Sequence, residues 1–174
     1  MDLLDFTSED LYFDEPLQTE ARDCLDGAAA HYGEKKAEAS LLRAYFLAPE
    51  HPLVLVALYR YFYYQHRLVD ALRVADRVLV IFAKRLGLPE DWRDLNEFQI
   101  GGGVMVSMTM IRFYLLALKG AGFMELRLGQ YAEALVRLEK VAELDAHDRL
   151  GAQALLVVAQ QALHSQTSPA LAKS

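Results

Sequence analysis

The chain has 174 residues, of which 53% are hydrophobic and 24% are charged, so it can bury a core and is not a disordered protein. Its formal net charge of −6 comes from residues 1–16, which hold six acidic side chains and no basic one. The rest of the chain is close to neutral and has no basic surface for phosphates. We therefore expect no nucleic-acid binding.

The single cysteine, Cys24, cannot form an internal disulfide. The first residues are acidic where a secretory signal would need Lys or Arg. The longest apolar runs, 53–58 and 101–110, are shorter than the roughly 20 residues that span a bilayer. We expect a cytoplasmic protein with no membrane association.

Apolar residues recur at spacings of three and four, and strand-like alternation is nearly absent, which predicts an all-α fold. Pro16 suits a helix start and Gly33 a helix end, while Pro49 and Pro52 bracket a turn. In the first half of the chain, the predicted helices cover about 16–32, 34–47, 52–66 and from there to 86.

Pro89 begins a short predicted helix that carries the only tryptophan, Trp92. Three consecutive glycines at 101–103 are expected to form a hinge at a helix boundary. Further helices are predicted over about 104–128, 131–144 and 148–163. Residues 165–174 are small and polar and are expected to form a flexible tail.

An internal repeat is the strongest signal, because residues 55–72 and 118–135 align without a gap. Each segment has apolar residues three apart, then a short turn, then an acidic-Ala-Leu triplet. These triplets contain Ala71 and Ala134, and we expect both alanines to be buried where paired helices approach most closely.

This pattern resembles the tetratricopeptide repeat, a helical hairpin of about 34 residues. The stretch 129–135, followed by Leu138, Val141 and Asp145, carries most of the resemblance, although Ala146 stands where the family usually has proline. A weaker copy includes Ala37. The resemblance implies an antiparallel helical-hairpin solenoid with about three repeats and a C-terminal capping helix.

The resulting domain boundaries are approximate. An acidic amphipathic segment covers 1–16, and a helical domain covers 17–164. Within that domain, the repeats lie at about 18–51, 52–85 and 115–148, with an insert at 86–114.

In proteins of this family, the first helices of successive hairpins line a concave groove that binds a partner segment. The resemblance therefore implies a partner-binding set on these helices: Arg22, Val56, Arg60, Tyr63, Tyr64, Lys119, Phe123 and Arg127. Its mixture of rings and cations suits an acidic segment bearing apolar side chains. The same cations could instead pair with neighbouring acids. Asp26 and Ala57 replace the asparagines of the family's chaperone-tail binders, which argues against that ligand.

No motif indicates catalysis, a metal or a cofactor. The glycines at 101–103 lack the Lys-Ser/Thr of a phosphate loop, and the five histidines show no zinc-binding spacing. Cys24 has no assigned base to activate it. We therefore expect a non-enzymatic adaptor or assembly chaperone. Short bacterial proteins of this kind also occur among nitrogen-fixation genes, and a secretion-system chaperone is the alternative.

Residues 1–15 interleave acids with large apolar residues such as Phe6 and Phe13. Two hypotheses follow. This segment could occupy the groove, its own or that of a second copy in a homodimer, with carboxylates near Arg22, Arg60 or Arg127. It could instead form a short helix that caps the first repeat.

Overall fold

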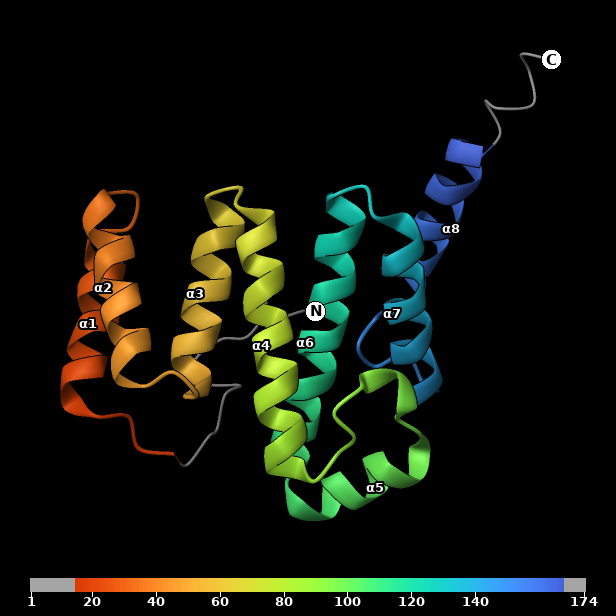
Figure 1. Cartoon of the computed structure of the whole chain (residues 1–174), viewed down its shortest axis with the longest axis horizontal. Coiled ribbons are helices and arrows are strands. Elements are labelled where there is room, and N and C mark those ends of the chain that lie inside the picture. The colour runs from red at the N-terminus through yellow and green to blue at the C-terminus, as the bar shows by residue number, and fades with distance from the viewer. Residues whose placement is uncertain (1–14, 168–174) are drawn as a thin grey trace.

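The computed structural model describes residues 15–167, which fold into α-helices and one 3₁₀ helix without a strand in that range (Figure 1). The helices are α1 (Thr19–Ala30), α2 (Lys35–Leu47), α3 (Pro52–Tyr64), α4 (Leu68–Leu86), the 3₁₀ helix η1 (Trp92–Asp94), α5 (Glu97–Val106), α6 (Met108–Arg127), α7 (Tyr131–Leu144) and α8 (Gln153–Thr167). The predicted all-α class is confirmed.

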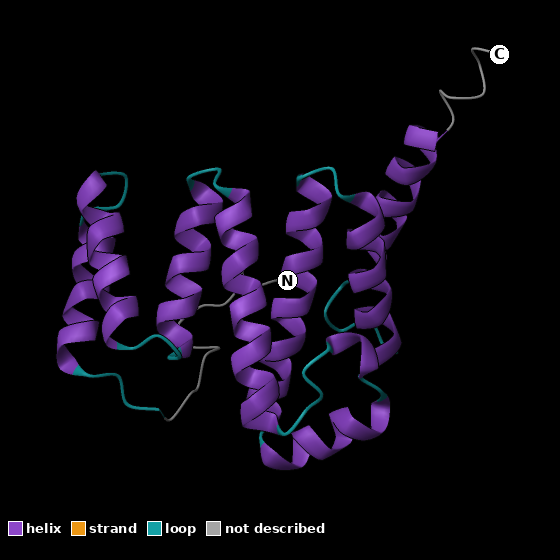
Figure 2. Cartoon of the chain, in the orientation of Figure 1, coloured by secondary structure: helices purple, strands orange, loops and turns teal. Residues whose placement is uncertain are grey.

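Helices that follow one another in the chain pack as antiparallel neighbours: α1 with α2, α3 with α4, and α6 with α7. Figure 2 shows the short loops that join these pairs at one common edge of the molecule, which we call the turn edge. At the opposite edge, α5 lies across the ends of the neighbouring helices (Figure 1). Helices α4 and α6 pack closely and join the last two pairs.

Local sequence explains where α3 begins and where α4 ends. The ring Nδ1 of His51 accepts a hydrogen bond from the backbone N–H of Leu53 at 3.3 Å, and Pro52 occupies the first helical turn. At the end of α4, Gly87 adopts a left-handed conformation with φ of +66°, which glycine tolerates at a helix end.

The expected hinge at 101–103 is wrong, because all three glycines lie inside α5. The side chains and backbones of Asn96 and Gln99 form a reciprocal capping box at 3.0 and 3.1 Å, which starts α5 before the glycines are reached. The break instead falls at Ser107, whose backbone is extended. Its hydroxyl accepts a hydrogen bond from the backbone N–H of Met110 at 3.2 Å and so caps α6.

The last helix begins five residues later than predicted, at Gln153 rather than at Asp148. Asp148 has a positive φ of 48°, and its Oδ1 accepts hydrogen bonds from the backbone N–H groups of Ala152 at 2.6 Å and Gln153 at 3.1 Å. Asp148 therefore holds the α7–α8 loop instead of starting the helix. Of the expected tail at 165–174, the first three residues belong to α8 and the others lie outside the described residues.

The core lies mainly between α3, α4, α6 and α7. Ala71 and Ala134 both have 0% exposure, which confirms their predicted burial. Gly122 marks another close approach, because a Cβ at this position would lie 3.0 Å from Cγ of Leu138.

No helix in the described range has the length and apolar character needed to cross a membrane.

Candidate partner-binding surface

Aromatic side chains from α3 and α6 meet near the turn edge. The ring centroids of Tyr63 and Phe123 are 6.2 Å apart, and those of Tyr63 and Tyr64 are 5.3 Å apart. Arg127 is exposed, and its Nη1 donates a hydrogen bond to the Tyr63 hydroxyl at 3.5 Å. The structure thus brings together four of the residues implied by the resemblance. We call Tyr63, Tyr64, Phe123 and Arg127 the aromatic surface.

Tyr32 and Tyr61 extend this group of rings toward α1. Their rings meet edge to face, with centroids 6.1 Å apart. Burial raises the pKa of Tyr32, nearby Tyr64 and Tyr61 raise it further, and the cation of Arg60 opposes them. Arg60 is half-buried in α3. Tyr32 was missed by the sequence analysis, although its place beside Gly33 at a hairpin turn was a usable signal.

The other implied residues lie elsewhere. Val56 and Lys119 were expected on the binding surface, but each has only 4% exposure and is buried. The Nζ of Lys119 donates a hydrogen bond to the Leu150 carbonyl oxygen at 2.6 Å, because the α7–α8 loop covers this part of α6. Arg22 is exposed in the first turn of α1, at the opposite end of that helix from Tyr32.

A second feature is a partly buried ion-pair network around Arg137, in which Asp76 is 46% exposed. Its Nε donates a hydrogen bond to Oε1 of Glu125 at 2.8 Å, and its Nη1 lies 2.8 Å from Oδ1 of Asp76. The guanidinium also stacks over the Trp92 ring, 5.1 Å from its centroid. Burial raises the pKa of Glu125, with Arg137 opposing. The network ties α4, α6 and α7 to the connection that carries Trp92.

A third feature is a cleft of about 510 Å³ between the first half of α6 and the α7–α8 loop. Apolar side chains line it together with two arginines and one acid: Met108, Ile111, Arg112, Leu115, Leu144, Asp145, Arg149 and Leu150. We call this the α6 cleft. Among these lining residues, Met108 is 62% exposed. This cleft was not predicted from the sequence.

Within residues 15–167, no group of three or more His, Cys, Asp or Glu side chains is arranged to hold a metal ion. Cys24 is half-buried and packs against the hydrophobic core as a free thiol.

Comparison with known proteins gives one informative relative. The chain is 46% identical over 158 residues to an uncharacterized 19.8 kDa protein in the nifW 5' region of Azotobacter chroococcum mcd 1, and the alignment covers 91% of this chain and 88% of that protein. No protein-family model matches the sequence, and a search of solved structures finds no significant match. Identity of this extent over nearly the whole of both chains shows that the protein belongs to the same family as this Azotobacter protein.

Proposed function

We propose that this protein is a non-catalytic adaptor or assembly chaperone that holds an extended segment of a partner protein against the aromatic surface. The observation that carries the proposal is the contact of Tyr63 with both Phe123 and Arg127, which places rings and a guanidinium from two helix pairs side by side. Tyrosine and arginine side chains contribute strongly to protein interfaces when they pack together.

The proposed architecture is a tetratricopeptide-like solenoid in which α1–α2, α3–α4 and α6–α7 are the hairpins and α8 is the capping helix. Antiparallel packing within each pair supports this proposal. So does the complete burial of Ala37, Ala71 and Ala134, which occupy corresponding positions in the second helices. Such hairpins expose an apolar face when isolated, and stacking buries it.

The surface also indicates the chemistry of the partner. Exposed ring faces, such as that of Tyr64 at 56% exposure, can pack against apolar side chains. Arg127 presents a planar donor that binds a carboxylate with two hydrogen bonds. The fitting partner is therefore a segment that alternates apolar and acidic residues.

The relative supports a role in nitrogen fixation. The Azotobacter protein lies in the region 5' of nifW, and the two proteins share a family. We propose that this chain acts as an accessory protein in that process, binding a component whose assembly or maintenance it assists.

The test is affinity capture with the full-length tagged protein from nitrogen-fixing cells, followed by binding measurements with the purified partner. A Tyr63→Ala, Arg127→Glu double variant should lose that partner. The matched control is Arg73→Glu, because Arg73 is also highly exposed but lies on α4. Thermal melts establish that all three proteins are folded. Equal affinity of the partner for the double variant and the control would refute the proposed surface.

A further inference from the structure

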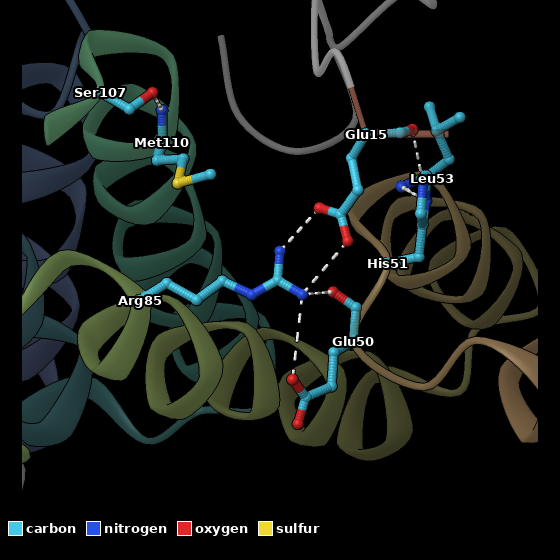
Figure 3. A network of polar contacts seen from close by, with 7 residues as sticks. All are labelled: Glu15, Glu50, His51, Leu53, Arg85, Ser107 and Met110. Atoms are coloured by element: carbon cyan, nitrogen blue, oxygen red, sulfur yellow. Dashed lines mark hydrogen bonds and ion pairs between the residues drawn. The ribbon is translucent and has the colours of Figure 1, made fainter. Parts of the chain in front are cut away.

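The N-terminal segment leaves the described fold at a defined anchor. The carboxylate of Glu15 receives hydrogen bonds from both Nη atoms of Arg85, at 2.8 and 3.5 Å, and its carbonyl oxygen lies 3.1 Å from Nε2 of His51 (Figure 3). Arg85 also donates to the Glu50 carbonyl oxygen at 3.1 Å. Glu15 therefore pairs with none of the three arginines named in the sequence-based hypothesis, and the described chain begins beside the end of α4.

This anchor is close to the first half of α6. The Arg85 guanidinium lies over the Phe82 ring, 5.1 Å from its centroid, and the rings of Phe82 and Phe113 are 4.8 Å apart. Arg85, which binds Glu15, is thus connected to α6 through Phe82 and Phe113. Figure 3 draws Arg85 and Glu15 in one view with Ser107 and Met110, where α6 begins.

We infer that residues 1–14 dock in cis along the first half of α6, with apolar side chains in the α6 cleft and carboxylates beside Arg112 and Arg149. This inference does not depend on the proposed partner or on the aromatic surface, which lies at the other end of α6.

Residues 1–14 and the α6 cleft are complementary in charge and in hydrophobicity. Residues 1–14 contain five acids, no basic side chain and, besides Met1, six large apolar residues: Leu3, Leu4, Phe6, Leu11, Tyr12 and Phe13. The α6 cleft offers apolar walls flanked by two exposed arginines. Apolar residues at this density favour burial, while the acids favour a receptor that carries cations.

Length also permits the intramolecular arrangement. Fourteen extended residues span about 45 Å, whereas the 20 residues of α6 rise through roughly 30 Å. A segment that starts beside Arg85 can therefore reach the whole α6 cleft. The tether keeps its local concentration high, in the millimolar range typical of short flexible linkers, so weak contacts suffice.

The test is hydrogen–deuterium exchange of the full-length protein, followed for peptides from residues 1–14. We expect these amides to exchange roughly tenfold or more slowly than in the free synthetic peptide 1–14, at all protein concentrations. An Arg112→Glu, Arg149→Glu double variant should bring exchange in the segment close to the rate of the free peptide. Arg73→Glu should leave it slow, and exchange within α3 should be unchanged in every variant.

A second pair of substitutions tests the same contact from the segment. Leu11→Ser with Phe13→Ser should also accelerate exchange of residues 1–14, and this change alters no residue of the helical core. Exchange in the wild-type segment at the rate of the free peptide would overturn the inference. Protection that rises with protein concentration would also overturn it, because the segment would then dock on a second copy.

Discussion

The ammonium group of Lys119 lies inside the protein and donates a 2.6 Å hydrogen bond to the carbonyl oxygen of Leu150. This bond holds the α7–α8 loop against the middle of α6. A Lys119→Glu substitution would place a carboxylate beside a buried carbonyl oxygen, at a cost of about 3–5 kcal/mol. We therefore expect a large loss of stability to heat and to urea. If Lys119 were exposed, the same substitution would affect partner binding and leave stability nearly unchanged.

Arg127→Glu is the matched charge reversal, eight residues further along α6. Because Arg127 is exposed, its reversal should change the free energy of unfolding by no more than about 0.5 kcal/mol. Equal urea midpoints for the Lys119 and Arg127 variants would contradict the burial of Lys119.

Substitution of Ala134 tests the close packing of α6 with α7. Ala134 has 0% exposure, so the larger side chain of Ala134→Leu should overpack the interface and cost about 1–3 kcal/mol. Ala132→Leu in the same helix is the control, since Ala132 is exposed. A melting temperature of Ala134→Leu at or above that of the control would count against this packing.

Two glycines should respond to alanine in opposite directions. At Gly122, a Cβ would lie 3.0 and 3.2 Å from Leu138 atoms and 3.3 Å from Cβ of Arg137, so Gly122→Ala should destabilise the protein by about 1–3 kcal/mol. At Gly101, a Cβ would meet nothing within 4 Å, and Gly101→Ala should stabilise α5 by about 0.5–1 kcal/mol. Urea unfolding measures both, and shifts of the same sign would be inconsistent with this geometry.

The buried carboxyl of Glu125 should make stability depend on pH. Because its pKa is raised in the folded protein, the folded state binds this proton more tightly than the unfolded chain does. This contribution is complete below the unfolded pKa of about 4.3 and is lost as the pH rises through the folded pKa. The stability advantage of the wild type over Glu125→Gln should therefore shrink from pH 4 toward neutral pH, as measured by urea titrations. An advantage that grows over this interval would contradict the raised pKa.

The sequence predicted the helices best where apolar spacing and end signals agree. The helix predicted over 131–144 has those bounds, and Ala71 and Ala134 are buried as expected. The hinge expected at 101–103 is absent, because the three glycines lie inside α5. The capping pattern of Asn96 and Gln99 was present in the sequence and accounts for the continuous helix.

The candidate surface was harder to predict because it depends on contacts between distant residues. Phe123 and Tyr63 were assigned to one surface and do meet. Lys119 follows the same spacing along α6, yet the α7–α8 loop covers it from 31 residues away. Likewise, the pairing of Glu15 with Arg85 joins residues 70 positions apart, and no local pattern indicates it.

The cations that pack on Trp92 determine what its fluorescence can report. Trp92 is the only tryptophan, it is buried, and the guanidinium groups of Arg93 and Arg137 lie 4.4 and 5.1 Å from its ring centroid. Its emission therefore reports whether α4, α6 and α7 remain assembled around this connection. If the α1–α2 pair unwound first, helical ellipticity would fall while the emission maximum stayed constant. Following both signals in one denaturant titration would resolve the unfolding of the two ends of the chain.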